Sequence, residues 1–329
     1  MSKIAIDIMG GDNAPDEILK GCILALQELE STLVLVGKEE IIKEKLTAYT
    51  YDKNRVEIVN ADEIIEMEDS PVAAIRQKKN SSMVIGLKLV KEQKVDGFIS
   101  AGSTGALLTG ATLIVGRIKG VDRPALAPFI PTKKGYALLI DSGANVDAKP
   151  SYLAQFARMG TVYMSQCMGN NNPKVGLINI GTEEEKGNQL TKEAYQILKE
   201  DKLINFYGNV EARDIPKGDV DILVCDGFTG NIILKFMEGF GGWILGMIKG
   251  AFVKNITTKL AALLMKSGIS EIKEKFNYST KGGAPFLGVN GLIVKTHGSS
   301  KSAEIISTLI QTEGFIKAEL VDKIKDNFQ

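Results

Sequence analysis

The feature that most constrains this chain is a repeated order of a short apolar run, a glycine-rich polar turn and an amphipathic helix. The apolar, β-branched runs predicted as strands are Ile4–Asp7, Leu33–Val36, Val56–Val59, Gly97–Ser100, Leu126–Phe129, Tyr136–Asp141, Val175–Ile180, Ile204–Tyr207, Val220–Cys225 and Leu292–Lys295. The predicted helices between them are Asp16–Glu28, Ser82–Glu92, Tyr152–Met168, Thr191–Lys199 and Ser302–Gly314. Most runs are apolar on both faces, which is typical of covered parallel strands. This order predicts a three-layer α/β/α fold around a mostly parallel sheet.

One segment, residues 231–275, breaks the alternation because its pattern is helical and contains no strand. Its first arm holds Trp243, Ile244 and Phe252 among more apolar residues than one helix face needs, and KLAALLMKSG is expected at its turn. We therefore predict an inserted helical hairpin over 231–275 that protrudes from the rest. No linker or repeat divides the chain, so residues 1–329 are predicted to form a single intertwined catalytic unit.

Composition narrows the class of protein. Lys plus Arg and Asp plus Glu number 40 each, so no overall positive charge attracts nucleic acid. Cys22, Cys167 and Cys225 are odd in number and far apart, which is typical of buried thiols in a reducing compartment. The N-terminal residues run straight into a strand pattern without a secretory leader, and a cytoplasmic location is expected.

Ligands of parallel α/β sheets collect beyond the carboxyl ends of the strands, where helix N-termini offer free N–H groups to anions. Glycine, hydroxyl and amide residues fill several turns expected at that edge. The candidates there for contacts to an anion are Gly10, Gly11, Asn80, Ser82, Ser103 and Thr104. The same residue types also make tight turns and helix caps, so a structural role is the alternative at each position.

Four later turns carry the remaining candidates. Asn145 follows a strand in DSGANVDAKP, and Lys186 follows the strand VGLINI in GTEEEKGN. Asp226 and Asn231 flank two glycines in CDGFTGN, and the only histidine, His297, lies in THGSS. A lysine at such an edge can neutralise phosphate or polarise a carbonyl. The alternatives are helix caps for Asn145, Asp226 and Asn231, a solvated acidic loop around Lys186, and a capping or packing role for His297.

Common cofactor motifs are missing from these turns. SAGSTGA lacks the Lys-Ser/Thr ending of a phosphate-binding Walker loop and the G-x-G-x-x-G pattern of dinucleotide sites. One histidine and scattered cysteines do not suit a structural zinc site, and no G-x-S-x-G nucleophile turn occurs. We therefore expect no cofactor and no metal.

Taken in order, the turns resemble those of the bacterial phosphate acyltransferases of phospholipid synthesis. The matching segments are AIDIMGGDNAP, RQKKNSSM, SAGSTGAL, GRIKGVDRPALAP, DSGANVDAKP, NIGTEEEKGN, GNVEARD, CDGFTGN and KTHGSS. The match covers nearly the whole chain. That family's fold is similar to the fold of isocitrate and isopropylmalate dehydrogenases and phosphate acetyltransferases, although fold alone does not fix a reaction.

The resemblance implies that an acyl thioester on acyl carrier protein reacts with inorganic phosphate to give acyl phosphate and free carrier. Phosphate would attack the thioester directly, so no protein nucleophile is needed. We expect Lys186 and Asn231 to be the catalytic pair, with Asp226 orienting one of them. The expected phosphate and substrate contacts are Gly10, Gly11, Asn80, Ser82, Ser103, Thr104, Asn145 and His297.

The resemblance also implies a homodimer formed through the hairpin and peripheral attachment to the inner face of the membrane. Leu260, Leu263, Leu264 and Met265 are the expected membrane contacts, because they lie between lysines at the turn. The acidic carrier protein needs a basic surface, for which the cluster Arg117, Lys119 and Arg123 is the candidate. A glycerol-3-phosphate acyltransferase is a candidate partner.

Three alternatives remain open on the sequence. A phosphate acetyl- or butyryltransferase acting on an acyl-coenzyme A would use similar turns and the same nucleophile. A dehydrogenase of the related fold would need a nucleotide signature that we do not find. A membrane-surface scaffold could bind acyl carriers without turnover.

Overall fold

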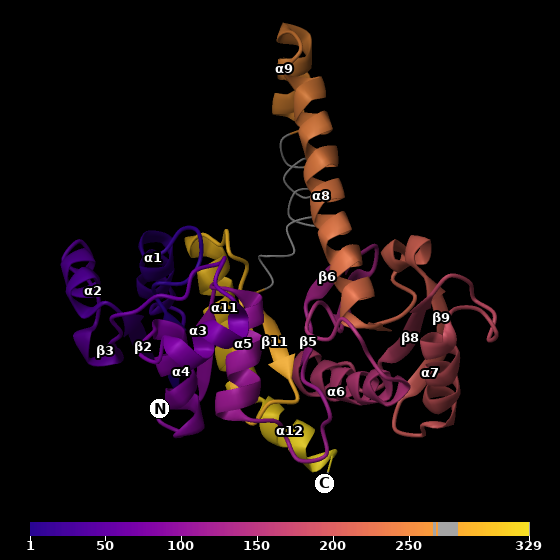
Figure 1. Cartoon of the computed structure of the whole chain (residues 1–329). Helices are drawn as coiled ribbons and strands as arrows, with labels where there is room; N and C mark the ends of the chain where they lie inside the picture. Colours follow the sequence, from indigo (N-terminus) through magenta and orange to yellow (C-terminus); the bar gives the residue numbers. More distant parts are fainter. Residues whose placement is uncertain (266–267, 269–281, 329) are drawn as a thin grey trace.

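The structure, a computed structural model, describes residues 1–265, 268 and 282–328. Its strands form two sheets (Figure 1). The first sheet has the order β3 (Val56–Asn60), β2 (Thr32–Gly37), β1 (Lys3–Asp7), β4 (Gly97–Ser100), β12 (Leu292–Lys295), β11 (Ala284–Leu287) and β5 (Ala125–Leu126). The second has the order β6 (Phe129–Thr132), β7 (Gly135–Ile140), β10 (Ile222–Val224), β8 (Lys174–Asn179) and β9 (Asn205–Glu211). Strands β3-β2-β1-β4-β12 and β7-β10-β8-β9 are parallel within their sheets. The predicted mostly parallel α/β fold is confirmed.

Helices cover both faces of the first sheet. On one face, α1 (Asp16–Ala25) packs beside α11 (Ser302–Lys317), and their apolar residues join the core cluster that includes β1 and β2. On the other, α4 (Ser82–Lys91) and α5 (Thr104–Gly110) bury residues such as Leu87 and Leu107 against Phe98. Apolar residues at successive strand positions meet helices on both sides, which is the physical reason for the continuous apolar runs.

The second sheet carries α6 (Pro150–Met168) and α7 (Gln189–Glu200) on one face. On the other face Ile233, Leu234 and Met237 of α8 (Gly227–Phe252) pack against a small core with the 3-10 helix η3 (Ala212–Lys217). One cluster of buried side chains runs under both sheets, since Tyr163 of α6 packs against Phe315 of α11 with ring centroids 5.2 Å apart. Whether the chain folds as one intertwined unit stays a prediction.

The remaining helices are short. They are α2 (Glu39–Leu46), η1 (Lys53–Arg55), α3 (Pro71–Gln77), the π-helical turn η2 (Ala111–Val115) and α12 (Leu320–Asp326). The five helices predicted from periodicity are all present, and most of their boundaries agree within three residues. The short helices were not predicted because three to eight residues give too few turns for a clear helical period.

The joint between the two sheets differs from the prediction. The predicted strand Leu126–Phe129 is split into β5 in the first sheet and β6 in the second. Pro128 separates them, and a proline cannot donate to a strand ladder. Ser142 N, which follows β7 of the second sheet, donates to Leu126 O of β5 at 3.1 Å, which keeps the two sheets adjacent. Strand β11 was also missed, because its run APFL offers only four residues and includes a proline.

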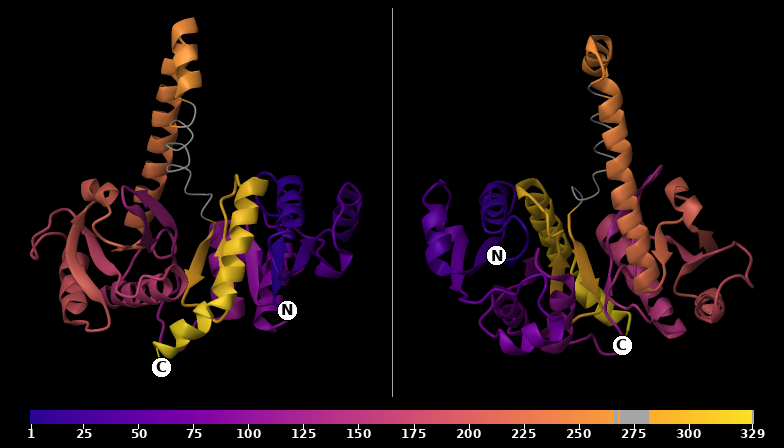
Figure 2. Two further views of the ribbon diagram at one scale, coloured as in Figure 1. Left: turned by 180° about the vertical axis from the view of Figure 1, so that it is seen from behind. Right: turned by 45° about the horizontal axis from the view of Figure 1, so that its top comes forward.

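Helix α8 projects away from both sheets (Figures 1 and 2) and is followed by α9 (Ile256–Leu264). The predicted first arm falls within α8, and whether residues 231–275 form an inserted hairpin stays a prediction. The chain turns at residues 253–255, where Asn255 caps α9 by accepting from Thr258 N at 2.9 Å, and most of KLAALLMKSG is helical. Residues 266–267 and 269–275 of the predicted hairpin lie outside the described residues.

By length and composition, α8 is the one helix within the described residues that could cross a membrane. Its most apolar window has a mean hydropathy of 1.2 and is only 6% buried. The surface that α8 exposes is therefore large and apolar for a helix that packs on the sheet only through its first turns.

Candidate active site

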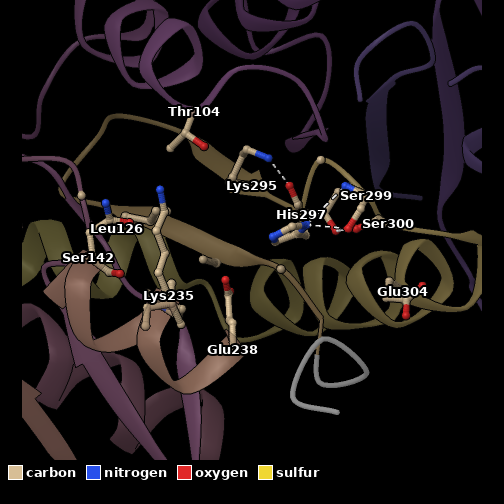
Figure 3. A pocket seen from close by; sticks show the side chains of 18 of the residues that line it. Thr104, Leu126, Ser142, Lys235, Glu238, Lys295, His297, Ser299, Ser300 and Glu304 are labelled. Carbon is tan, nitrogen blue, oxygen red and sulfur yellow. Dashed lines mark hydrogen bonds between the residues drawn. The ribbon is translucent and has the colours of Figure 1, made fainter. Parts of the chain in front are cut away.

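A cavity of about 740 Å³ lies where the turns after β4 and β12 face the start of α8 (Figure 3). Strands β4 and β12 are neighbours, with Ser100 beside Lys295, so their following turns leave the sheet at the same edge. The turn after β1 joins them, because Asp12 N donates to Gly298 O at 2.8 Å. The site thus lies at the carboxyl ends of parallel strands, as expected for this architecture.

Lys295, the last residue of β12, is a buried lysine in the wall of this cavity. Its ammonium donates to the carbonyl oxygens of Ala101, at 3.2 Å, and Thr296. Within the described residues no carboxylate lies in ion-pair distance of its Nζ, although Asp7 and Asp12 act on it from further away. Burial lowers the pKa of Lys295 to about 8, and the two aspartates partly oppose this effect.

The turn after Lys295 carries His297 at the cavity surface. The backbone N–H of Ser299 points at His297 Nδ1 at 3.2 Å, and the Ser299 hydroxyl lies 2.8 Å from the same atom. Because a backbone N–H can only donate, Nδ1 is the acceptor and the neutral ring carries its proton on Nε2. Below it, the hydroxyls of Thr296 and Ser300 are 2.8 Å apart and fix the turn.

The opposite wall belongs to the second sheet and α8. Asn231, Lys235 and Glu238 of α8 line it together with Ser142, which follows β7. The Ser142 side chain is buried, and its hydroxyl finds no hydrogen-bond partner among the described residues. An unpaired buried hydroxyl is costly, so a cavity wall that contains one is suited to a polar ligand.

Behind this wall, Asp141 anchors the loop that carries Ser142. Its fully buried carboxylate accepts from the backbone N–H groups of Leu126 at 2.9 Å and Asn145 at 2.6 Å, and from Asn145 Nδ2 at 3.0 Å. Desolvation raises the pKa of Asp141 even though these hydrogen bonds oppose the effect. The side chain of Asn145, a predicted substrate contact, is therefore used to hold Asp141.

The first turn of α8 packs tightly against the same loop because it contains glycines. A Cβ at Gly230 would lie 1.9 Å from the carbonyl oxygen of Asp141, and one at Gly227 would lie 2.7 Å from Asn145 O. Asp226 caps the helix by accepting from Thr229 N and Thr229 Oγ1, both at 2.8 Å. Asn231 reaches the cavity one turn later, so the cap positions it through the helix.

The predicted residues after β1 pack the first-sheet turns. Asp7 is buried and accepts from the Ser100 hydroxyl at 2.8 Å, and Ser82 also hydrogen-bonds to it. Burial raises the pKa of Asp7. A Cβ at Gly10 would lie 2.5 Å from this carboxylate, and Gly11 has a φ of +100°, which favours glycine. These residues support the site from behind and do not line the cavity.

Three further predicted residues lie outside the cavity wall. Ser103 caps α5 by accepting from Ala106 N at 3.4 Å, and Asn80 N donates to Glu63 Oε2 at 2.8 Å. Lys186 is exposed in the loop after β8, and its carbonyl accepts from Asn179 Nδ2 at 3.0 Å. One strand, β10, separates β8 from β7. Thr104, Asn231 and His297 are the predicted residues that line the cavity, and the catalytic role of Lys186 stays a prediction.

The basic cluster Arg117, Lys119 and Arg123 lies at the other end of β12. Arg117 pairs with Val289, and Ile118 N donates to Gly288 O at 3.0 Å. Both partners precede β12, whereas the cavity residues follow it, and the strand puts on the order of 15 Å between them. These basic residues thus lie at the opposite end of β12 from Lys295, and their role in receiving the carrier protein stays a prediction.

Two residues of this site were missed by sequence reasoning. Lys295 was counted as a strand residue, although a lysine that ends an apolar strand beside the only histidine is a usable signal. Ser142 was passed over in favour of Asn145 in the same turn. Within the described ranges, no group of three His, Cys, Asp or Glu residues is placed to hold a metal ion.

Solved structures with a similar fold define the class. A phosphotransacetylase from Streptococcus pyogenes superposes with a TM-score of 0.64 at 18% identity, covering 96% of this chain and 94% of that one. A branched-chain phosphotransacylase from Enterococcus faecalis gives 0.60 at 14% identity, over 96% and 99%. A 4-hydroxythreonine-4-phosphate dehydrogenase from Klebsiella pneumoniae gives 0.51 at 12% identity, over 95% and 98%. This chain is thus an α/β protein of the phosphotransacetylase fold.

Sequence relatives define the family. Residues 2–323 match the family model described as "Fatty acid synthesis protein". A phosphate acyltransferase from Clostridium tetani is 52% identical over 325 residues, 98% of this chain and 97% of that protein. One from Clostridium perfringens strain SM101 is 50% identical over 325 residues, 98% and 96%. The chain belongs to this family of fatty acid synthesis proteins, and the resemblance stated above is confirmed.

Proposed function

We propose that this chain is an enzyme that transfers an acyl group from a thioester to inorganic phosphate and releases an acyl phosphate for phospholipid synthesis. The observation that carries the proposal is the identity of about half of all residues, over nearly the whole chain, with proteins named phosphate acyltransferase. The cavity at the strand ends supports it, because donors from two walls face one space.

The reaction needs orientation and charge stabilisation more than a protein nucleophile. A phosphate oxygen forms a bond to the thioester carbonyl carbon, the C–S bond breaks, and the departing thiolate takes a proton from solvent. An oxyanion develops on the carbonyl oxygen during the attack. The Ser142 hydroxyl and the Asn231 amide share one cavity wall, and both can donate to that oxygen.

Asn231, Asp226 and Lys186 keep distinct roles in this proposal. Asn231 donates to the substrate, and Asp226 acts through it by capping α8. Lys186 would act on the thioester side, from the exposed loop after β8.

The test incubates the purified chain with a long-chain acyl carrier protein and inorganic phosphate, and quantifies acyl phosphate and freed carrier. Phosphate-dependent release is expected, with losses in kcat/KM of about 10²-fold or more for Asn231→Ala and Lys186→Ala. Lys192→Ala, an exposed lysine on α7, is the matched control. Absence of release from every thioester would exclude the enzymatic proposal and leave the non-catalytic acyl-carrier scaffold.

Acyl carrier protein is the proposed donor because the family resemblance implies it. The competing donor is acyl-coenzyme A, as in a phosphate acetyl- or butyryltransferase. Parallel assays with the same acyl chain on both carriers separate the two. A higher kcat/KM on acyl-coenzyme A than on the carrier protein would assign the competing activity.

A homodimer formed through α8 is part of the proposal. Large apolar side chains recur every three or four residues on the exposed surface of this helix: Phe228, Ile232, Phe236, Phe240, Trp243 and Met247. The Phe236 and Phe240 rings already stack at 5.5 Å. Light scattering should give a dimer for the wild type and a monomer for Phe236→Glu, since a second copy is what would bury this stripe.

We further propose that the cytoplasmic chain attaches peripherally to the inner face of the membrane through the tip of α9. Leu263, Leu264 and Met265 are exposed there, and Leu264 is 86% exposed. Leu260 belongs to the same helix. Leu264→Glu should abolish flotation with anionic lipid vesicles.

A glycerol-3-phosphate acyltransferase is the proposed consumer of the acyl phosphate product. Its pull-down with the membrane-bound chain tests that partnership.

A further inference from the structure

We propose that Lys295 is the residue that binds the attacking phosphate, with Thr104 and His297 completing its site on the first-sheet wall of the cavity. Figure 3 shows Lys295 between Thr104 and His297. The inference rests on the proposed function for the identity of the anion as inorganic phosphate. The site itself rests on geometry.

The charge of Lys295 is unmatched within the part of the chain that the structure describes. Lys295 is 8% exposed, yet it has no ion-pair partner among the described residues. Its Nζ donates to two carbonyl oxygens, which leaves the third N–H of an ammonium without a protein acceptor. A buried charge without a counter-ion is costly to hold, and an anion in the adjoining cavity removes that cost.

The position of Lys295 also suits an anion site. Lys295 ends β12 beside β4, so Nζ lies between the turns that carry Thr104 and His297. The carbonyls of Ala101 and Thr296 fix the long side chain in one direction, and a fixed cation binds a dianion with less loss of side-chain entropy than a surface lysine. Lys186 lacks these constraints, since its side chain is exposed.

The two walls of the cavity offer different groups to a ligand. The first-sheet wall offers a cation, a hydroxyl and an imidazole N–H, which match the charge and the several oxygen atoms of phosphate. The second-sheet wall offers the unpaired Ser142 hydroxyl and the Asn231 amide, which match a single carbonyl oxygen. The two reactants therefore approach from opposite sides of one cavity, as a direct attack requires.

Charge on Lys295 makes phosphate binding depend on pH. The aspartates that act on Nζ are Asp7 from β1 and Asp12 from the following turn, and the other titratable groups lining the cavity are His297, Lys235, Glu238 and Glu304. Burial lowers the pKa of Lys295 to about 8, so the ammonium loses its proton above that pH. Phosphate affinity should therefore fall as pH rises through 8.

The experiment titrates inorganic phosphate into the full-length chain by calorimetry without any thioester, so that binding is tested apart from turnover. Lys295→Met should weaken phosphate binding about 10- to 100-fold, and the KM for phosphate should rise by the same factor with the KM for the acyl donor unchanged. Lys301→Met, an exposed lysine six residues further on, is the matched control and should bind as wild type. Lys295→Arg should bind phosphate without the weakening above pH 8, because a guanidinium stays charged.

Two outcomes would overturn the inference. Unchanged phosphate binding in a folded Lys295→Met variant, checked by thermal melting, would show that the cation serves packing alone. Lys295-dependent binding of 4′-phosphopantetheine with no binding of inorganic phosphate would assign the site to the carrier's prosthetic group. If phosphate binds through Lys295 but no thioester is turned over, the site stands and the proposed reaction fails.

Discussion

Two regions of the cavity differ in how their charged groups are paired: Asp141 and Asp226 behind the second-sheet wall, and Lys295 in the first-sheet wall. On the second-sheet side, Asp141 accepts from the N–H groups of Leu126 in β5 and of Asn145, and Asp226 accepts from the backbone N–H and the hydroxyl of Thr229 in α8. On the first-sheet side, Lys295 keeps a charge that no described carboxylate pairs. The comparison teaches that a polar turn becomes a binding site where its side chains lack partners, because a satisfied group gains little from a ligand.

The largest expected effect is on stability, at Asp141 behind the second-sheet wall. Asp141→Ala removes a buried acceptor and leaves the N–H groups of Leu126 and Asn145 unpaired, so the free energy of unfolding should fall by about 3–5 kcal/mol. Urea denaturation measures it. Asp219→Ala is the control, since its ion pair with Lys134 is exposed and should contribute little to stability. Equal effects of the two changes would contradict the comparison.

The next effect is the pH dependence of stability that the buried Lys295 causes. Because the folded-state pKa of Lys295, about 8, lies below its ordinary value of 10.5, the unfolded state binds more protons between pH 8 and 10.5. The free-energy cost of burying the charged Lys295 ammonium is fully present below pH 8, and it disappears as the pH rises from 8 to 10.5. The stability of wild type relative to Lys295→Met should therefore increase by roughly 3 kcal/mol from pH 7.5 to 10.5. A flat difference would show that Lys295 is not buried as a charge.

The close approach of α8 to the Asp141 loop depends on Gly230. Gly230→Ala places a methyl group against a backbone carbonyl, so the free energy of unfolding should fall by about 2–3 kcal/mol. Gly314→Ala in α11 is the matched control, because a Cβ there meets open space and should stabilise the helix by up to about 1 kcal/mol. Thermal melting of both variants distinguishes contact from helix propensity.

The smallest effect concerns Asp226 and separates capping from catalysis. Asp226→Ala should cost about 1 kcal/mol of stability as a lost helix cap. Asp226→Ser restores a capping oxygen without the charge and should recover most of that loss and the wild-type kcat. A variant that is stable but more than about tenfold slower in kcat would show that the carboxylate itself takes part in the reaction.

The sequence by itself determined the class of fold, the edge of the sheet where ligands bind, and the family. Apolar runs, helical periods and turn residues are local, and the carboxyl ends of parallel strands meet by geometry, so Thr104, Asn231 and His297 could be chosen from sequence. Only the tertiary structure decided which polar residues form hydrogen bonds within the protein and which remain free for a ligand. The hydrogen bond from Asn145 to Asp141 and the absence of an ion pair between Lys295 and any described residue depend on groups that are distant in sequence. The burial and the pairing of these side chains are fixed only when strands β4, β7 and β12 are assembled.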